Sequence, residues 1–378
     1  MAGTVLVNYW YAHPVGHAIE ALRYCLGYKA ADPGLSVNLL LNDGMPLELV
    51  GCCPFVDELY AVSYRRFDEP DGDPRAALAA VPRDWDWVVE NHREREPTHD
   101  DLRGFRVFFD ASHEHFRPRL AHTWTGGEPP GYRRHRQLRL ELPAASRERA
   151  RETLEGRQAI SVVLAGHSGL RFEYPSVPSW RLILGALAER FPEAVFCLIG
   201  KHAPGAALSI SRIGATEVER VAEGLPALDC FDLALLDQLA LVEASALFLS
   251  PHTGFGFAAV AVGTPWLELP GGQWHQSFFN GVPFYSVLPD AERYPCFGWG
   301  APLPTVDDED GEGPRTVSMS VARIREDLPE LVHGAELLVE RRLSYEEALR
   351  DYFPRLLAAY GGDRSRVFAF DGLDWGYL

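Results

Sequence analysis

The sequence contains few lysines and cysteines, and it lacks a long apolar run. Among 36 basic residues only Lys29 and Lys201 are lysines, and this bias toward arginine indicates a GC-rich bacterial genome. Six cysteines in 378 residues exclude a disulfide scaffold, and without metal-ligand spacing we expect them to be reduced core thiols. Because no apolar stretch reaches about 20 residues, we expect no membrane span or secretion signal, and a cytoplasmic location by default.

The chain also lacks an excess of positive charge. It has 53 acidic and 36 basic residues, a net charge of −17 with histidine neutral. This charge opposes binding to a phosphate backbone, so nucleic acid is not expected as a partner. Hydrophobic residues make up 47% of the chain and charged residues 24%, an ordinary globular composition. The length predicts two domains.

Short apolar runs alternate with helical patterns in both halves of the chain. The expected strands are residues 4–9, 36–41, 54–60, 87–90, 105–109, 159–164, 194–200, 246–250 and 264–269. The expected helices are residues 18–28, 144–155, 180–190, 232–244 and 345–360. This alternation predicts an α/β fold of two tandem doubly wound, Rossmann-like domains with parallel sheets.

The expected domains are residues 1–155 and 156–345, followed by a helix and tail at 346–378 that packs back on the N-terminal domain. The acidic segment 307–313 is expected to be a solvated loop. Ligands of such sheets bind beyond the carboxyl ends of the strands, so we expect the site in the cleft between the domains.

A glycine-bearing turn follows the expected strand at residues 246–250. Gly254 and Gly256 would let the backbone approach a ligand, and a helix beginning near Phe255 would direct its N–H groups toward an anion. His252 and Thr253 add side-chain donors. The turn therefore predicts a diphosphate cradle without lysine. The alternative is a tight strand-to-helix turn whose histidine has a structural hydrogen bond.

Residues 251–281 resemble the donor-site signature of inverting GT-B nucleotide-sugar glycosyltransferases. In that signature a strand ends in His-x-Gly before a helix, Gly-x-Pro precedes the next strand, and a loop with Gln and Asn follows. The matching residues are His252, Gly254, Gly263, Pro265, Pro270, Gln276 and Asn280. Residues 54–59, and residues 165–168 followed by Trp180, resemble two segments of the bacterial heptosyltransferases.

The resemblance implies a GT-B fold that binds a nucleotide diphosphate-sugar donor. Gln276, together with Gln273 or His275, would face the transferred sugar or the ribose. No metal and no cofactor are expected, because a helix dipole and the His252 loop can offset the charge of the diphosphate. The implied donor site comprises Gly166, His167, Ser168, His252, Thr253, Gly254, Phe255, Gly256, Gln273 and Gln276.

The first strand is followed by the loop His13-Pro14-Val15-Gly16-His17. Heptosyltransferases have Gly-Asp here with the Asp as base, whereas plant and macrolide glycosyltransferases have Gly-His with the His as base. The resemblance to the second pattern makes His17 the expected general base, with Gly16 and His13 beside it and His13 as the alternative base. A helix cap or a hydrogen bond between domains is the competing structural role for His17.

Other polar and aromatic residues are weaker candidates. Glu90, or Asp110 after the next expected strand, would orient the catalytic histidine, unless each is an ordinary polar group at a strand end. His113 and His115 are expected on a solvated loop rather than at a metal. A further set lines either an acceptor pocket or the core: Trp10, Tyr11 and Trp124.

The expected function is inverting sugar transfer to an acceptor hydroxyl. The acidic surface favours a neutral or cationic acceptor such as an aminoglycoside over an anionic one, and an envelope saccharide is the other option. Two alternatives remain open, a sugar-nucleotide 2-epimerase of the same fold and a non-catalytic glycosyltransferase-like partner protein. The oligomeric state is not predicted.

Overall fold

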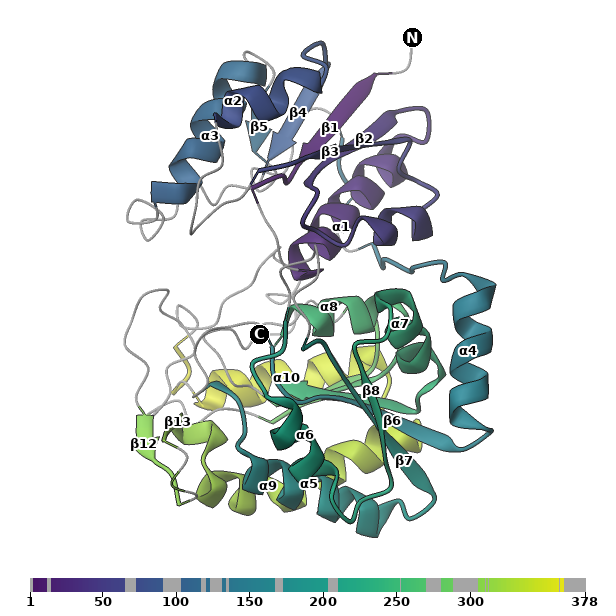
Figure 1. Ribbon diagram of the computed structural model, residues 1–378, viewed down its shortest axis with the longest axis vertical. Helices are drawn as coiled ribbons and strands as arrows, with labels where there is room; N and C mark the ends of the chain where they lie inside the picture. Colours follow the sequence, from purple (N-terminus) through teal and green to yellow (C-terminus); the bar gives the residue numbers. More distant parts are fainter. Residues whose placement is uncertain are drawn as a thin grey trace. The chain divides into compact units, whose positions relative to one another are not determined.

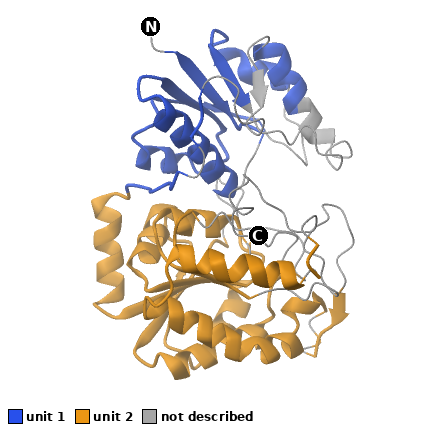
Figure 2. Cartoon of the chain, turned by 180° about the vertical axis from the view of Figure 1, so that it is seen from behind, with its two compact units in different colours: residues 1–141, 205–208 blue, residues 142–204, 209–378 orange. Residues whose placement is uncertain are grey.

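The structure is a computed structural model that describes most of the chain (Figure 1). The described residues are 3–11, 15–64, 73–90, 103–116, 120–122, 131–133, 136–166, 173–202, 210–251, 253–269, 280–287, 305–309, 311, 313–359 and 361–363. The chain divides into two units, the first formed by residues 1–141 and the second by most of residues 142–378 (Figure 2).

The first unit is built on a five-stranded sheet with the order β3-β2-β1-β4-β5, in which every pairing is parallel. Its strands are β1 (Thr4–Asn8), β2 (Ser36–Asn42), β3 (Glu58–Val62), β4 (Trp87–Glu90) and β5 (Leu120–His122). Its helices are α1 (Val15–Ala31), α2 (Pro74–Ala77) and α3 (Arg103–Phe116), with short 3₁₀ turns η1 (Leu47–Cys52) and η2 (Leu78–Ala80).

Helices α1 and α3 contact opposite faces of this sheet. Successive side chains along a strand point to opposite faces. Just after β1, the Tyr9 ring contacts Tyr24 of α1, with ring centroids 5.9 Å apart. The next residue, Trp10, contacts Phe108 of α3 at 4.5 Å. Since β1 is followed by α1 and its neighbour β4 by α3, the chain changes faces between β1 and β4.

The second unit has a six-stranded parallel sheet with the order β11-β10-β9-β6-β7-β8. Its strands are β6 (Gln158–Val163), β7 (Ala194–Gly200), β8 (Ala227–Phe231), β9 (Leu247–Pro251), β10 (Trp266–Leu269) and β11 (Phe284–Ser286). The other elements are α4 (Ala144–Leu154), α5 (Val177–Arg190), α6 (Ala215–Ala222), α7 (Leu235–Ala244), α8 (Gly254–Ala261), α9 (Val321–Val339), α10 (Tyr345–Ala359), η7 (Val317–Met319) and the antiparallel hairpin β12 (Thr305–Asp307) to β13 (Pro314–Thr316).

Apolar side chains on both faces of the second sheet are covered by helices, which explains its continuous apolar strands. One face forms a core with α5, α6 and α9 that includes Leu249, Leu267 and Leu331. On the other face, Trp266 packs against α8 and Phe284 against Tyr352 of α10. When the strands of each unit are numbered from one in chain order, both sheets have the order 3-2-1-4-5, and the second sheet continues with a sixth strand, β11. The expected doubly wound α/β class is confirmed.

One expected strand is wrong. Residues 105–109 lie in helix α3, and the strand of this region is β5, at residues 120–122. The apolar run had no decisive period, and short runs of this kind do not separate a strand from a buried helix. In α3, Phe108, Ser112 and Phe116 are buried at helical spacing. The expected strand at residues 54–60 also begins later, at Glu58.

The acidic segment is more ordered than expected for a solvated loop. Asp307 ends strand β12, and the side chain of Asp308 is buried. Asp308 Oδ1 accepts hydrogen bonds from the backbone N–H groups of Glu309 and Val321, both at 2.9 Å. Val321 is the first residue of α9, so this carboxylate stabilises the beginning of that helix.

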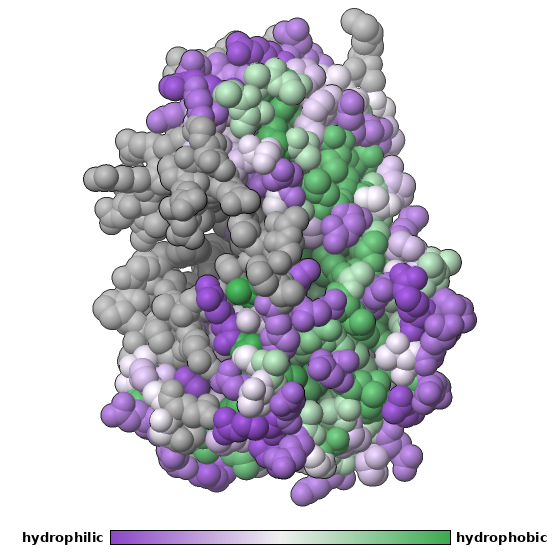
Figure 3. All heavy atoms as spheres, viewed as in Figure 1, coloured by the Kyte–Doolittle hydropathy of each residue, from purple (hydrophilic) through white to green (hydrophobic). Residues whose placement is uncertain are grey.

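On the face shown in Figure 3, hydrophilic side chains lie on the described parts of both units. Among the described residues, the exposed large apolar side chains are Leu233 and Val306, at 39% and 38% exposure. No helix formed by the described residues has both the length and the apolar character needed to span a membrane.

Candidate functional site

The loops after β6 and β9 meet at the point where the second sheet changes direction. These two strands are neighbours, yet their following helices, α5 and α8, cover opposite faces. A Cβ placed on Gly166, after β6, would lie 3.1 Å from Thr253 Cγ2, after β9, and 2.9 Å from the Tyr174 hydroxyl oxygen. Open α/β sheets bind ligands beyond the carboxyl ends of strands at such a switch point. The structure thus brings Gly166 and Thr253 together where a ligand is expected.

Helix α8 begins directly at this junction. Thr253 is its N-cap, and the Thr253 side chain accepts a hydrogen bond from the N–H of Gly256 at 3.2 Å. The sequence of α8 is GFGFAAVA, with no acidic residue in the first turn. The first N–H groups of a helix have no partner within the helix, and together with the dipole they attract an anion. The helix beginning expected near Phe255 is confirmed.

Loop residues 164–166 are held in place from two sides. The indole N–H of Trp180, a fully buried residue of α5, donates to the backbone oxygen of Leu164 at 3.1 Å. The backbone oxygen of Gly166 accepts from the N–H of Arg212 at 2.9 Å. Trp180, singled out from the sequence, is therefore an anchor for the Gly166 loop.

Two residues of the matched donor signature, Gly263 and Asn280, and the neighbouring Gly256 have structural roles. A Cβ on Gly256 would lie 2.6 Å from the Trp266 ring, so only glycine allows α8 to pack this closely on β10. Gly263 has φ +91° in the turn that ends α8. Asn280 also has a positive φ, and its side chain donates to the backbone oxygen of Val260 at 3.1 Å. These residues position α8.

The remaining donor-site predictions fall outside the described residues and stay predictions. They are His167, Ser168, His252, Gln273 and Gln276, together with the alternative His275 and the matched Pro270. The described part of the expected donor site is Gly166, Thr253, Gly254, Phe255 and Gly256.

The first unit places His17 at the N-terminal end of α1, just beyond the carboxyl end of β1. His17 is the third residue of α1, after Gly16, and its side chain is 22% exposed. Its Nδ1 lies 3.2 Å from Oε2 of Glu20, one turn further along the helix. The Tyr11 ring contacts the imidazole edge-on, with ring centroids 6.3 Å apart. The alternative base, His13, lies outside the described residues.

The expected partners of His17 have different outcomes. Glu90 ends β4 opposite Asn8 of β1, at the carboxyl edge of the sheet, and its orienting role stays a prediction. The expected position of Asp110 is wrong, because this residue lies within α3 and not at a strand end. Sequence reasoning missed Glu20, although the spacing His17-x-x-Glu20 on an expected helix was a usable signal.

Two further expectations about the first unit are settled by burial. His113 and His115 lie on helix α3 and not on a loop, and the buried His115 donates from Nε2 to the backbone oxygen of Val81 at 2.9 Å. Burial lowers the pKa of His115, which favours its neutral form. Trp10 and Tyr11 are 1% and 2% exposed, so these two are core residues. Trp124 lies outside the described residues.

The described titratable residues form no group of three or more His, Cys, Asp or Glu side chains that could hold a metal ion. Burial raises the pKa of the Cys25 thiol and raises that of Cys53 to about 12. The expectation of core thiols is confirmed for the described cysteines, which are buried without a disulfide among them: Cys25, Cys52, Cys53, Cys197 and Cys230. Cys296 lies outside the described residues.

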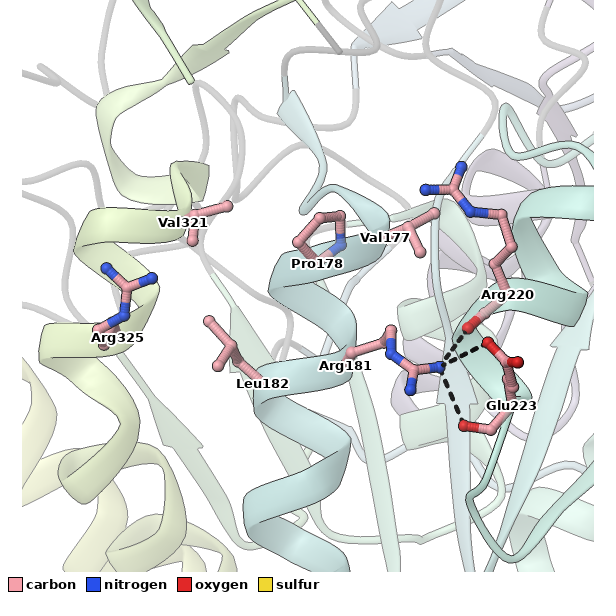
Figure 4. Close-up of a pocket in the computed structure, with 8 residues that line it drawn as sticks. All are labelled: Val177, Pro178, Arg181, Leu182, Arg220, Glu223, Val321 and Arg325. Carbon is pink, nitrogen blue, oxygen red and sulfur yellow. Dashed lines mark hydrogen bonds and ion pairs between the residues drawn. The ribbon is translucent and has the colours of Figure 1, made fainter. Parts of the chain in front are cut away.

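A surface hollow of about 550 Å³ lies between α5, α6 and α9 of the second unit and is lined by none of the predicted site residues (Figure 4). Two of its arginines, Arg181 and Arg325, pair with groups of the second unit itself. Arg181 donates to the backbone oxygens of Arg220 and Glu223, at 2.6 and 2.9 Å, and forms an ion pair with the Glu223 carboxylate. Arg325 pairs with Glu309 at 3.3 Å. Internal pairing leaves this hollow a poor candidate for the anionic donor.

Comparison with known proteins finds solved structures that share the two-unit fold. No protein-family model matches the chain, and no curated protein matches its sequence. A solved glycosyl transferase family 9 structure from Veillonella parvula is similar, with a TM-score of 0.56 at 13% identity, covering 88% of this chain and 97% of that one. The E. coli ADP-heptose heptosyltransferase II and heptosyltransferase WaaC, also 13% identical, have TM-scores of 0.49 and 0.47 over 88% of this chain and 99% of theirs.

The two Rossmann-like units and the likeness to the Veillonella structure confirm the expected GT-B fold and the resemblance to heptosyltransferases. At 13% identity the likeness concerns the fold, and the function has to be argued from the site.

Proposed function

We propose that the chain is an inverting glycosyltransferase that moves a sugar from a nucleotide diphosphate-sugar to an acceptor hydroxyl. The observation that carries the proposal is the junction of the Gly166 loop with the Thr253-capped start of α8, at the switch point of the second sheet. Amides at a helix N-terminus whose first turn carries no acidic side chain suit a diphosphate. The fold is shared with a glycosyl transferase of family 9, which supports sugar transfer as the reaction class.

In this proposal the diphosphate binds at the first turn of α8. The Thr253 cap occupies the N–H of Gly256, so the amides of Gly254 and Phe255 are the donors we assign to the phosphate oxygens. His252 directly precedes the cap and would add a side-chain hydrogen bond. Gln273 and Gln276 would contact the sugar or ribose, and His167 with Ser168 would extend the Gly166 loop toward the donor.

His17 is the proposed general base. As the acceptor oxygen attacks the anomeric carbon, its proton passes to the imidazole, the bond from that carbon to the phosphate oxygen breaks, and the nucleoside diphosphate leaves. A single displacement of this kind inverts the anomeric centre. An imidazole with an ordinary pKa of about 6.5 is largely unprotonated at neutral pH and can accept the proton.

The acceptor is proposed to be neutral or cationic. A protein with a net charge of −17 attracts cations over long range and repels anions. A natural product such as an aminoglycoside fits this field, and an envelope saccharide is the second option.

The test begins with calorimetric titration of the full chain with ADP, UDP, GDP and dTDP. One of them is expected to bind, and His252→Ala should weaken that binding by about 10- to 100-fold, because a charge-assisted hydrogen bond is worth about 1.5–3 kcal/mol. His202→Ala is the matched control, since His202 stacks on Phe231 at another strand end. No binding of any nucleotide, or equal binding by His252→Ala, would contradict the donor site.

A second measurement separates transfer from epimerisation. The chain is incubated with the matching nucleotide sugar, with and without an aminoglycoside or saccharide acceptor. A 2-epimerase changes the donor without an acceptor, whereas a transferase leaves the sugar configuration at C2 intact. Formation of epimerised donor would contradict the proposed function and identify the chain as a 2-epimerase. A chain that binds nucleotide but catalyses neither reaction would be a non-catalytic partner.

A further inference from the structure

Two ionisable side chains face each other across the first turns of α1. His17 and Glu20 are three residues apart, and Nδ1 of the imidazole lies 3.2 Å from Oε2 of the carboxylate. The side chains are 22% and 9% exposed, respectively. Ion pairs that merely support a helix are usually solvated and contribute little, about 0.3–0.5 kcal/mol. This pair is largely withdrawn from water.

Burial of Glu20 has an energetic cost that requires compensation. An isolated carboxylate taken out of water is strongly destabilised unless hydrogen-bond donors surround it. The surrounding face of α1 is apolar and packed, with Val15, Ala18 and Ile19 all buried. The hydrogen bond from His17 is therefore part of what allows a carboxylate at this position.

The direction of this hydrogen bond fixes the state of the imidazole. A carboxylate only accepts, so Nδ1 carries the hydrogen and donates it to Glu20. In a neutral imidazole the lone pair then resides on Nε2. The Tyr11 ring, 2% exposed, contacts the imidazole and restricts its rotation. His17 is thus held in one tautomer and one orientation by a residue of its own helix.

We propose that Glu20 is the positioning residue of His17: it holds the Nδ1–H tautomer, so that Nε2 accepts the acceptor proton, and it stabilises the imidazolium that forms. The inference rests on the proposed function for its catalytic part. It gives the orienting role to a residue on α1, so the base and its partner move as one rigid element. A carboxylate on a separate strand would depend on the tertiary fold to place it beside the base.

The first experiment needs no substrate. The full chain is labelled with ¹⁵N-histidine, and the imidazole nitrogens are observed by NMR near pH 8.5, well above the ordinary histidine pKa of about 6.5. The His17 signals are assigned by their loss in His17→Gln. We expect a protonated Nδ1 and an unprotonated Nε2. In Glu20→Met the Nε2–H tautomer that water favours should return, while Glu48→Gln, an exposed glutamate of the same unit, should leave the signals unchanged.

The second experiment measures catalysis with water as the acceptor. The probe is hydrolysis of ADP-, UDP-, GDP- or dTDP-glucose, whichever binds most tightly. His17→Ala should lower kcat by about 10²–10⁴-fold, the usual contribution of a positioned base. Glu20→Met should lower kcat by at least about tenfold with an unchanged KM, and Glu20→Gln, which retains an acceptor oxygen, should recover part of the loss. The double variant should be no slower than His17→Ala, because the two residues act as a unit.

Each outcome has a defined meaning. An Nε2–H tautomer in the wild-type chain, or the same tautomer in wild type and Glu20→Met, overturns the role of Glu20 whatever the reaction is. Additive kcat losses in the double variant also overturn it, because they indicate a merely structural contribution. If Glu20 sets the tautomer but His17→Ala retains full kcat, the proposed base is wrong, and with it the catalytic part of the inference. Glu20→Gln serves as the fallback where Glu20→Met does not fold.

Discussion

Removing the N-cap hydroxyl of α8 is the sharpest perturbation of the proposed donor site. Thr253 is 5% exposed, and Thr253 Oγ1 accepts from the N–H of Gly256 at 3.2 Å. Thr253→Val keeps the shape of the side chain and deletes this acceptor. Because the backbone oxygen of Thr253 also accepts from Gly256 at 3.0 Å, the N–H is not left wholly unsatisfied. The cost should therefore be about 1 kcal/mol, the usual value for a lost cap.

The same free energy should appear in two measurements. A loss of about 1 kcal/mol lowers Tm by about 2–4 °C for a unit of 150–250 residues. If the diphosphate binds at this turn, the bound nucleotide has to restore the frayed N-terminus, which weakens its affinity by about fivefold. Differential scanning calorimetry measures the first effect, and isothermal titration with the preferred nucleoside diphosphate measures the second. Thr253→Ser keeps the acceptor and should retain nearly full affinity.

A matched cap elsewhere in the second unit provides the control. Ser320 is the N-cap of α9, and its hydroxyl oxygen accepts from the N–H of Arg323 at 3.3 Å. Ser320→Ala should lower Tm by a similar amount without weakening nucleotide binding. If both variants lose affinity equally, the effect is general destabilisation. If Thr253→Val loses stability but binds nucleotide as well as the wild type, the first turn of α8 does not hold the diphosphate.

Two further predictions concern packing and metal dependence. Gly27→Ala should destabilise the chain by about 1–3 kcal/mol despite the better helix propensity of alanine, because its Cβ would lie 2.0 Å from the Tyr132 ring. Gly51→Ala is the control and should leave Tm nearly unchanged, since a Cβ there would have nothing within 4 Å. Equal Tm values for the two variants would contradict the expected clash at Gly27. The Asp-x-Asp stretches of the sequence are residues 71–73, 84–86 and 308–310, and three of their carboxylates have structural partners: Asp73 caps α2, Asp86 accepts from Thr4 at the start of β1, and Asp308 accepts from Val321 at the start of α9. Sugar transfer should therefore keep its full rate in excess EDTA, and activity abolished by EDTA and restored by magnesium would overturn this.

Most strands could be predicted from the sequence because parallel strands buried on both faces are short, continuous apolar runs. Val5 to Val7 and Leu39 to Leu41, for example, are fully buried. The same property caused the error at residues 105–109. A helix packed against a sheet also shows an apolar run when only five residues are considered, and the burial of Ser112 and His115 hides its amphipathic period.

The parts of the candidate site that consist of backbone turns could be predicted from the sequence. The strand-to-helix turn at α8 and the Gly166 loop could be predicted because glycine and a capping threonine favour such turns through their own local conformation. The contact between them could not, since it depends on the order of strands in the sheet. The packing roles of Gly256 and Asn280 could not be predicted either, because they depend on the contacts of α8 with Trp266 and of Asn280 with Val260.

The two units have the same strand order, yet their switch-point helices are not interchangeable in the proposed reaction. The first turn of α8 carries no ionisable side chain, so no charge within that turn opposes the positive potential that its amides and dipole offer to a diphosphate. The start of α1 instead carries His17 beside the buried carboxylate of Glu20, whose negative charge would repel a diphosphate and attract a proton. Electrostatics therefore favours α8 over α1 for the proposed binding of the anionic donor, and α1 for the proposed proton transfer. Exchanging the two roles would place a carboxylate against the leaving group.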